Sequence, residues 1–331
     1  MTPRFAITIK RDTQVPRTPL QVCILFALVT ILMSERVATC QDDRDTISQI
    51  AKVWKKRSDA VRTIRVAWVE TSSRDRSKTA SVGRVVWTLG QGGKSRLERI
   101  GRDSTGSKTV SGKTISSFDG HKNYSFTSES LGGDWPRGIV WTDKHNDHIH
   151  NIQIRPWLIH LRPFGEPVPG ITTEGLRLRE GNANEDDREH LIVRTLAGPG
   201  EVVGEYWLDP ERDYVVEKYV ELANGRATMT LKIEYEKDTT IGWIPHSWKG
   251  SFENGSFSIS GRTERYELNP EIADSDFDID FKEGTMVFLR DDGVRALYGP
   301  NGRRRIITPE ESAAGFSYEE LLSELTGGAG D

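Results

Sequence analysis

Residues 227–236 read ATMTLKIEYE and decide the fold class. Apolar and polar side chains alternate through this stretch: Met229, Leu231, Ile233 and Tyr235 are separated by Thr230, Lys232 and Glu234. Because successive side chains of a strand point to opposite faces, the pattern predicts an antiparallel strand with one buried face.

Further strand candidates surround this stretch, and turn signals separate them. The candidates are Leu191–Leu196, Val202–Leu208, Tyr214–Leu222, Trp243–Phe252 and Ser256–Leu268. The turn signals are Gly198-Pro199-Gly200, Asp209-Pro210, Asn224-Gly225, Asp238 and Asn254-Gly255. Short strands at regular spacing with tight turns predict a meander whose sheet curls or closes.

A helix and more strands precede the meander. Ile47, Ile50, Ala51 and Trp54 share one face of a helix that runs from Asp45 or Thr46 to about Ala60. Lys55, Lys56 and Arg57 fall in its last turns, where the helix dipole favours positive charge. The strand candidates are Ile64–Val69, Val82–Leu89, Ser95–Gly101, Thr109–Phe118 and His121–Thr127.

The middle and the end of the chain have weaker patterns. Residues 128–147 and a loop that ends near Asp187 are predicted irregular, apart from a short helix, Trp157–Leu161, that Pro156 opens. No linker is visible within residues 45–285. Residues 286–331 are predicted to form an appendage, with a hairpin of Met286–Leu289 and Val294–Tyr298 followed by a short helix.

The first 40 residues are typical of an export signal. The run LQVCILFALVTILM at residues 20–33 carries no charge, follows basic residues and precedes the small residue Ala38. A membrane-spanning helix needs about 20 apolar residues, so this run is short for an anchor. Val37-Ala38-Thr39-Cys40 resembles the lipobox of bacterial lipoproteins, in which the cysteine carries lipid. We therefore expect a signal peptide at residues 1–40, followed by lipidation at Cys40 or by release of a soluble protein.

Charge and cysteine content limit which partners and which stabilising bonds the chain can have. Removing residues 1–40 removes five basic and two acidic residues, which leaves 40 basic and 47 acidic residues and a net charge of -7. A mildly acidic body argues against nucleic acid, because phosphate binding needs a basic field. No cysteine follows Cys40, so the body has neither an internal disulfide nor a thiolate metal site.

Clusters that suggest chemistry have simpler explanations. His145, His148 and His150 stand near two aspartates, but their spacing matches no metal signature. Asp274, Asp276, Asp278 and Asp280 alternate with Phe277, Ile279 and Phe281, which favours an extended segment with an acidic face over a calcium loop. No catalytic or dinucleotide motif is visible. We therefore expect no enzyme, no cofactor and no metal.

Aromatic side chains are the remaining signal. We select Trp54 on the helix with Trp68, Trp87, Tyr206 and Trp243 on strands as candidate ligand-binding residues. On inward faces they would form either an ordinary core or the lining of a cavity. The sequence leaves both alternatives open.

Several stretches resemble the LolA/LolB group of lipoprotein carriers, which includes RseB-like modules. They are Phe118-Asp119-Gly120-His121-Lys122-Asn123-Tyr124, Tyr206-Trp207-Leu208-Asp209-Pro210 with Tyr214-Val215-Val216-Glu217-Lys218, and Phe277-Asp278-Ile279-Asp280-Phe281 with Glu283-Gly284-Thr285. The resemblance covers about residues 45–285. It implies a mainly β (α+β) fold: a single strongly curved antiparallel sheet, or unclosed β-barrel, with helices covering the concave side. The domain would occupy residues 41–285.

In that group the concavity holds acyl chains. The resemblance thus implies an exported binding protein of the periplasm or cell envelope that holds an apolar, acyl or lipoprotein-like ligand without catalysis. An alternative is an envelope sensor that has a filled core and a protein partner. A hydrolase is a distant third hypothesis. Attachment to a membrane would depend on Cys40.

Overall fold

The computed structural model describes residues 43–74, 79–105, 108–128, 131, 134–146, 152–163, 175–179, 183–185, 188–198, 201–253 and 255–327. The chain divides into two compact units, Met1–Thr46 and Ile47–Asp331. The following description concerns the second unit. Its first element continues a helix that spans residues 43–60. Among all the residue ranges that the structure describes, no helix has the length and apolar character needed to cross a membrane.

Strands dominate the second unit. In chain order they are β1 Ile64–Arg74, β2 Thr79–Leu89, β3 Ser95–Thr105, β4 Lys108–Phe118, β5 Lys122–Thr127, β6 Arg137–Thr142, β7 Leu176–Leu178, β8 Ala183–Glu185, β9 Arg188–Gly198, β10 Glu201–Asp209, β11 Val215–Ala223, β12 Arg226–Asp238, β13 Gly242–Phe252, β14 Ser258–Leu268, β15 Met286–Leu289, β16 Val294–Tyr298 and β17 Arg304–Ile307. The labelled α-helices are α3 Arg155–Leu161, α4 Pro309–Ala314 and α5 Tyr318–Gly327.

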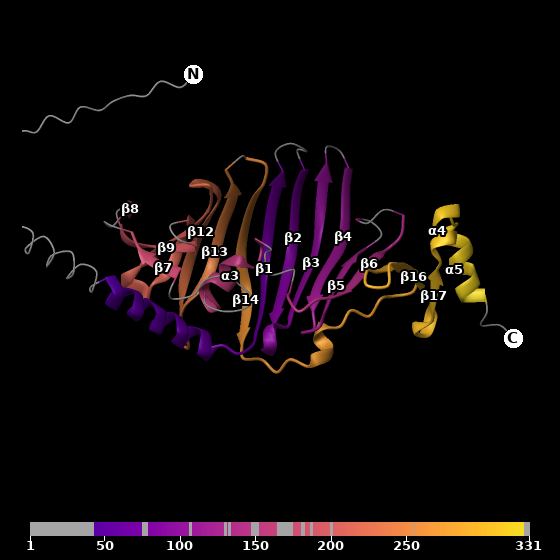
Figure 1. The fold of residues 1–331 in the computed structure, drawn as a ribbon, viewed down its shortest axis with the longest axis horizontal. Helices are drawn as coiled ribbons and strands as arrows, with labels where there is room; N and C mark the ends of the chain where they lie inside the picture. The colour runs from indigo at the N-terminus through magenta and orange to yellow at the C-terminus, as the bar shows by residue number, and fades with distance from the viewer. Residues whose placement is uncertain are drawn as a thin grey trace, which may run out of the picture. The chain divides into compact units, whose positions relative to one another are not determined.

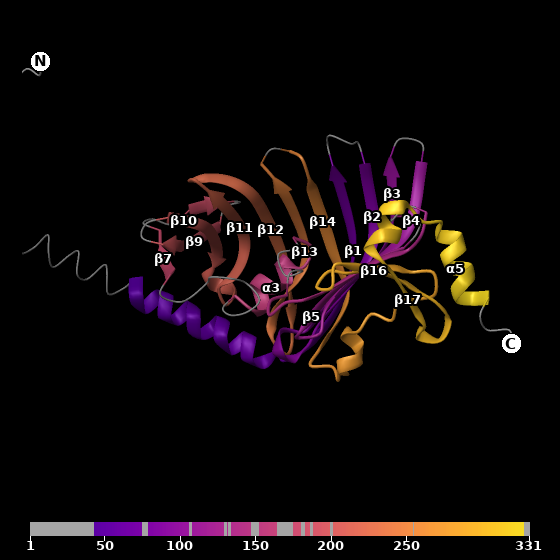
Figure 2. The ribbon, with the colours of Figure 1, turned by 45° about the vertical axis from the view of Figure 1, so that its right-hand side comes forward.

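The chain enters the sheet in its middle. β1 pairs with β2 on one side and with β14 on the other, so segments from both halves of the sequence meet there (Figure 1). Hairpin-like pairings continue from β2 to β6, and likewise from β14 back to β9. One large, curved and unclosed sheet results (Figure 2). The predicted fold class is therefore confirmed.

Register separates an inner face from an outer face. Trp68 lies opposite Val85, and Trp87 lies opposite both Val66 and Leu97, so these side chains share the inner face. The N-terminal helix and α3 cover this face, and they join it in one core cluster. Pro156 stands in the first turn of α3, where its missing N–H costs no helical hydrogen bond.

The segment that leaves β14 crosses to the outer face. After a 3-10 turn at Asp274–Phe277, Phe277, Ile279 and Phe281 are buried, with Ile279 and Phe281 in a second cluster beside Ile115. We call residues 274–282 the outer strap. Its alternation fits the predicted extended segment, except that its first four residues form a turn.

Three segments that the sequence predicted as irregular form strands, and one of them is β8, Ala183–Glu185, which pairs with β9. Arg137–Thr142 is β6, which pairs with β5 and, in parallel, with β15. Leu176–Leu178 is β7, which pairs with β9. All three strands are short and lie beside polar or glycine-rich stretches. Their pairing with distant strands therefore outweighs a weak local signal.

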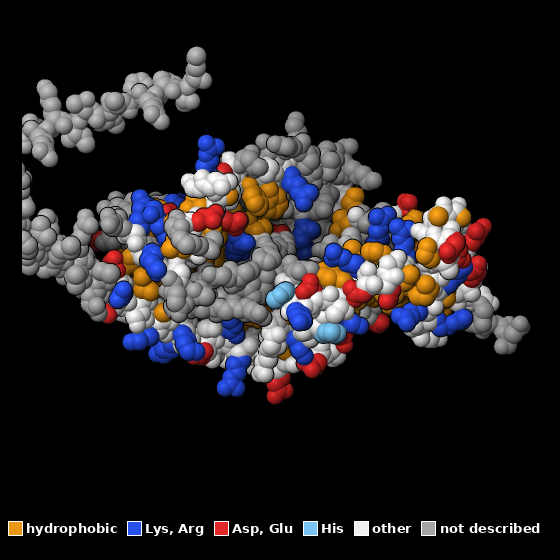
Figure 3. Space-filling view, in the orientation of Figure 1, with side chains coloured by type: hydrophobic (Ala, Val, Ile, Leu, Met, Phe, Trp, Pro, Cys, Tyr) orange, Lys and Arg blue, Asp and Glu red, His pale blue; other side chains and the backbone are white. Residues whose placement is uncertain are grey.

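The predicted hairpin of β15 and β16 is present, and β17 follows as an additional strand. Because β15 pairs with β6, these strands continue the sheet. Thr308 and Glu311 form the capping box of α4. α5 buries Leu321 and Leu325 against the β15–β17 face. Acidic side chains gather over α4 and α5, whereas basic ones follow the N-terminal helix (Figure 3).

Candidate ligand-binding face

Four of the five aromatic residues selected from the sequence lie in the core of the inner face. The exposed fraction is 1% for Trp54, 0% for Trp68 and Trp87, and 3% for Tyr206. The Trp54 and Tyr206 rings meet edge to face, with centroids 6.1 Å apart. Trp243 is only partly buried and lies outside this cluster, beneath the Arg212 guanidinium. The inner face is therefore filled by aromatic side chains.

The helical cover is attached to the sheet by hydrogen bonds to backbone carbonyls. Trp54 Nε1 donates to the Tyr214 carbonyl oxygen at 2.8 Å. Arg57 donates to the Asp213 carbonyl oxygen at 2.7 Å. Both acceptors belong to the turn between β10 and β11, and both acceptor residues have a φ of 53°. This left-handed conformation is uncommon outside glycine and presents the two carbonyls to the helix.

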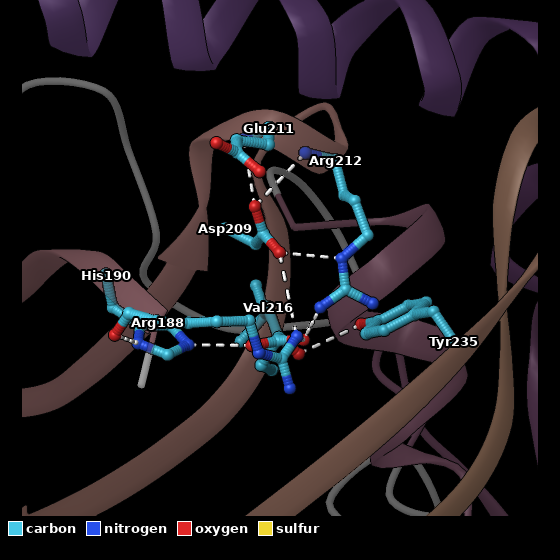
Figure 4. Close-up of polar contacts among 8 residues, drawn as sticks. Arg188, His190, Asp209, Glu211, Arg212, Val216 and Tyr235 are labelled. Carbon is cyan, nitrogen blue, oxygen red and sulfur yellow. Dashed lines mark hydrogen bonds and ion pairs between the residues drawn. The ribbon is translucent and has the colours of Figure 1, made fainter. Parts of the chain in front are cut away.

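The same turn is fixed from its other side by a charged network (Figure 4). Asp209 accepts hydrogen bonds from the backbone N–H groups of Glu211 and Arg212 and pairs with the Arg212 side chain at 2.6 Å. Glu217 pairs with Arg212, with Arg188 at 2.7 Å and with His190 Nε2 at 2.7 Å. Multiple partners hold the turn rigidly, so the carbonyls that receive the helix are preorganised.

A buried basic pair lies where the cover meets α3. Arg57 contacts His160 Nδ1 at 3.2 Å, and His160 is 0% exposed. Burial, reinforced by Arg57, holds the pKa of His160 well below its ordinary value of 6.5. Burial also lowers the pKa of Arg57 and raises that of Tyr235, whose ring centroid lies 5.2 Å from that of His160. The pair therefore contains a neutral imidazole beside a desolvated cation.

A buried carboxylate lies on the same face. Glu70 is 1% exposed, accepts a hydrogen bond from Gln153 and lies 3.7 Å from Arg99 Nε. Burial raises its pKa above the ordinary value of 4.5, against the opposing effects of Gln153 and Arg99. Gly261 and Gly83 stand opposite Glu70 on the two neighbouring strands. Glycine leaves room beside the carboxylate for larger neighbours such as Trp248.

The outer face carries a separate hollow of about 800 Å³ beneath the outer strap. Its apolar lining includes Ile115 and Phe126 of the sheet and Ile279 of the strap, and the rest of the lining includes charged groups of both signs. Arg65 pairs with Asp276 at 3.3 Å across it. The strap thus supplies part of the wall of this hollow.

Other sequence candidates have different outcomes. Cys40, His148 and His150 lie outside the described residues. Within the described ranges, no group of three or more His, Cys, Asp or Glu side chains is placed to hold a metal ion. Asp274 pairs with Lys94 and Asp276 with Arg65, so these two aspartates have protein partners.

Sequence reasoning missed Arg57, His160 and Glu70. Arg57 lies seven positions after Ile50 and three after Trp54, which places it on the buried helix face. Glu70 continues the alternation of Val66 and Trp68. These spacings were available as signals. His160 offered none, because its burial depends on how α3 docks.

No protein-family model matches the chain, and no curated protein matches it. Solved structures are similar to it. A DUF1329 family protein from Desulfovibrio piger has 10% identity and a TM-score of 0.44, over 70% of this chain and 95% of that chain. A protein from Vibrio parahaemolyticus, described as an outer membrane lipoprotein-sorting protein domain, has 11% identity and a TM-score of 0.44, over 72% and 97%. A LolA superfamily protein from Nitrosomonas europaea has 8% identity and a TM-score of 0.39, over 70% and 98%.

The LolA group, which the sequence resembles, is thus among the structures to which this chain is similar. All three TM-scores lie below 0.5. Ligand, partner and compartment therefore have to be argued from this chain's own residues.

Proposed function

We propose that the protein is an exported cell-envelope binding protein that holds an apolar ligand between its curved sheet and its helical cover. The ligand would be an acyl chain or a lipoprotein-like molecule. The attachment of the cover through Trp54 and Arg57 to two carbonyl oxygens supports this function. Such contacts can be released and remade without disturbing the sheet. No covalent chemistry is part of the proposal.

The closed cover buries polar groups at a cost. Arg57, His160 and Glu70 are all buried. Burial of ionisable groups is unfavourable unless their partners compensate fully. Opening the cover therefore costs less than it would for a wholly apolar interface. An entering acyl chain would gain about 0.8 kcal/mol for each buried CH₂ group.

Because the core is filled, the helical cover has to move before a ligand can bind. Trp54, Trp68 and Trp87 already occupy the inner face. An apolar ligand can therefore enter only after the helix around Trp54 moves away. The same filled core favours a second candidate: an envelope sensor or interaction module that binds a protein partner and no lipid.

One experiment distinguishes the lipid carrier from the interaction module. The protein is expressed with export into a bacterial envelope and then examined by native mass spectrometry and lipid extraction. The carrier function predicts co-purifying lipid and saturable binding of a fluorescent fatty acid. The variant Trp54→Ala should bind the probe faster than the parent, while Lys56→Ala on the exposed helix face should match the parent. Protein that is free of lipid and ignores the probe in all three forms would reject the carrier and leave the interaction module.

Export and anchoring belong to the same proposal. Cleavage near Cys40 would deliver the protein to the periplasm, and lipidation of Cys40 would attach it to a membrane. The intact mass of the mature chain distinguishes the forms. A start at unmodified Gln41 contradicts the anchor but leaves the soluble carrier.

A further inference from the structure

One row of paired residues crosses the inner face from the filled core to the C-terminal helix α5. In the order of strand pairing, the row consists of Trp87, Leu97, Ser116, Ser125, Ile139, Phe288, Arg295 and Ile307. Directly opposite residues of paired strands project to the same side of a sheet. The whole row therefore belongs to the inner face.

Both ends of this row are covered by helices, whereas its middle is exposed. Trp87 is 0% exposed in the cluster that contains the N-terminal helix and α3, and Ile307 is 1% exposed in the cluster that contains α5. Ile139 and Phe288, between these ends, are 41% and 38% exposed. Neither belongs to a core cluster of the described residues. We call Ser116, Ser125, Ile139, Phe288 and Arg295 the open strip.

The open strip has room for one more helix. The labels of Figures 1 and 2 show β5 and β6 between α3 and α5. Neighbouring strands lie about 4.8 Å apart, so the four steps of pairing from Ser116 to Arg295 extend about 19 Å. A helix with its side chains is about 10–12 Å wide. A single helix therefore fits on the strip without displacing α3 or α5.

The strands that carry the open strip hold basic residues but no acidic ones. No Asp or Glu occurs in β4, β5, β6, β15 or β16. Arg137 lies two residues before Ile139 and so on the same face, and Arg295 lies opposite Phe288. Both arginines are exposed. The floor of the strip is therefore apolar at its centre and positively charged beside it.

These two arginines have only neutral partners in the described part of the chain. The Arg137 guanidinium lies 5.7 Å from the centroid of the Trp135 ring, and Arg295 donates to the Ser312 hydroxyl at 3.4 Å. The acidic residue that follows β15, Asp291, accepts a hydrogen bond from the Thr142 N–H at 2.8 Å and interacts with Lys122 and Arg290. Its carboxylate therefore does not neutralise Arg137 or Arg295.

The helix α5 shows which kind of segment fits such a surface. Leu321 and Leu325 pack in one cluster with Ile307 of the inner face. Beside them, Arg305 donates to the Glu324 carboxylate at 2.8 Å. An acidic amphipathic helix thus matches an apolar floor with an arginine next to it. The open strip repeats this combination one step further along the sheet, with Phe288 and Arg295.

We propose that the open strip binds an acidic amphipathic helix of a partner protein. Apolar side chains of that helix would cover Ile139 and Phe288, and its carboxylates would pair with Arg137 and Arg295. A flat bilayer fits less well, because the helices on both sides of the strip stand about 10 Å above the sheet and would meet the membrane first. The strip lies outside the contacts of Trp54, so this assignment does not depend on a lipid ligand.

The test measures the binding of two fluorescent peptides to the whole mature protein. Each peptide has about 18 residues, enough to form a helix, with Leu along one face. One carries Glu on its flanks and the other carries Lys at the same positions. The acidic peptide should bind, with an affinity that falls as salt rises, and the basic peptide should bind at least about tenfold more weakly.

A first pair of variants tests the apolar floor. Ile139→Thr/Phe288→Thr should lower the affinity for the acidic peptide by about tenfold or more, because it removes the central apolar contacts. The matched control Val82→Thr/Ile100→Thr changes residues that are 52% and 57% exposed on the outer face. This control should stay within about twofold of the parent. Equal melting temperatures would show that both variants fold.

A second pair tests the charges. Arg137→Gln/Arg295→Gln should reduce the preference for the acidic over the basic peptide by about fivefold or more and flatten the salt dependence. The control Arg102→Gln/Arg226→Gln removes two exposed arginines of β3 and β12 and should keep the preference of the parent. Both variants retain the apolar floor, so the comparison isolates the two charges.

Several results would overturn the assignment. The parent binds neither peptide, or the acidic peptide binds equally well to the parent and to both variants of the strip. Equal losses in a variant and its matched control would indicate a non-specific effect of charge or stickiness. Binding of phosphatidylglycerol vesicles through Ile139 and Phe288, with no binding of the peptides, would assign the strip to a membrane. Lipid uptake beneath Trp54 is measured separately, so failure of either proposal leaves the other standing.

Discussion

The indole of Trp54 donates a hydrogen bond of 2.8 Å to the carbonyl oxygen of Tyr214, a residue 160 positions away in the sequence. The contact joins the helical cover to a turn at the edge of the inner face. It occurs because Tyr214 has a φ of 53°, which turns its carbonyl toward the helix. Replacing Trp54 therefore tests the attachment of the cover directly.

Trp54→Phe should lower the free energy of unfolding by about 1–3 kcal/mol. It removes one hydrogen bond, worth about 1 kcal/mol, and leaves a small cavity. Urea unfolding measures the change. Lys56→Ala, on the exposed side of the same helix, should change the stability by less than about 0.5 kcal/mol. Equal stability of the two variants would show that the indole does not hold the cover.

The sequence predicts which segments form strands, because strand formation here follows the local alternation of apolar and polar residues. β12 carries Leu231 and Ile233 inward and Lys232 outward, as the pattern predicted. The strands β10 and β11 follow equally plain turn signals. Pairing at long range was not readable, because the contacts of β1 with β14 and of β6 with β15 depend on the closure of large loops.

The polar part of the candidate site was harder to predict. The sequence places Arg57 in the last turns of the helix, where the dipole favours positive charge, but its spacing from Trp54 also places it on the buried face. A charged residue at such a position is normally expected in solvent, because burial without a carboxylate is costly. Its buried partners are the Asp213 carbonyl oxygen and His160, and neither the left-handed turn at Asp213 nor the docking of α3 has a clear sequence signal.

Stability should fall as the pH drops below about 6.5, because His160 stays neutral in the folded protein. The unfolded chain binds a proton there and the folded chain does not, so acid favours unfolding, by up to about 1.4 kcal/mol per pH unit. The charged and titratable groups that contact this imidazole are Arg57 and Tyr235, and the backbone of Trp243 also interacts with it. Protonation of His160 would place a second cation beside Arg57, and the repulsion between the two charges further disfavours that protonation.

His160→Gln tests this linkage. Glutamine keeps an acceptor for Arg57 but does not titrate. Unfolding by urea at about pH 7.5 and about pH 5 should show that the parent loses more stability than the variant. Glu70 has a raised pKa and so contributes with the opposite sign, but it is present in both proteins and cancels in the difference. Parallel pH profiles would contradict the neutral, buried imidazole.

Gly261→Ala should destabilise the inner face by about 1–3 kcal/mol through overpacking. A Cβ at this position would overlap the Trp248 ring, which packs edge to face on Trp68 with centroids 5.6 Å apart. Arg262→Ala, one residue along and exposed, serves as the control and should cost less than about 0.5 kcal/mol. Thermal or urea unfolding measures both. A neutral Gly261→Ala would mean that the indole pair can shift freely.

The outer strap should be held by its aromatic anchors rather than by its ion pairs. Phe277 is buried, so Phe277→Ala should cost about 3–5 kcal/mol. Asp274 pairs with Lys94 at 2.6 Å but is 89% exposed, so Asp274→Asn should cost less than about 1 kcal/mol. Urea unfolding of both variants measures the contrast. A reversed order would make the strap an electrostatic attachment.

A double-mutant cycle identifies the contact that holds Phe277. Gly90 has φ -99° and ψ -179°, which any residue adopts, so its backbone does not require glycine. A Cβ there would nevertheless overlap the Phe277 ring. Gly90→Ala should therefore destabilise the parent by about 1–3 kcal/mol but have a much smaller effect in the Phe277→Ala background, where the ring is missing. Additive changes would show that Gly90 is small for a reason other than the ring.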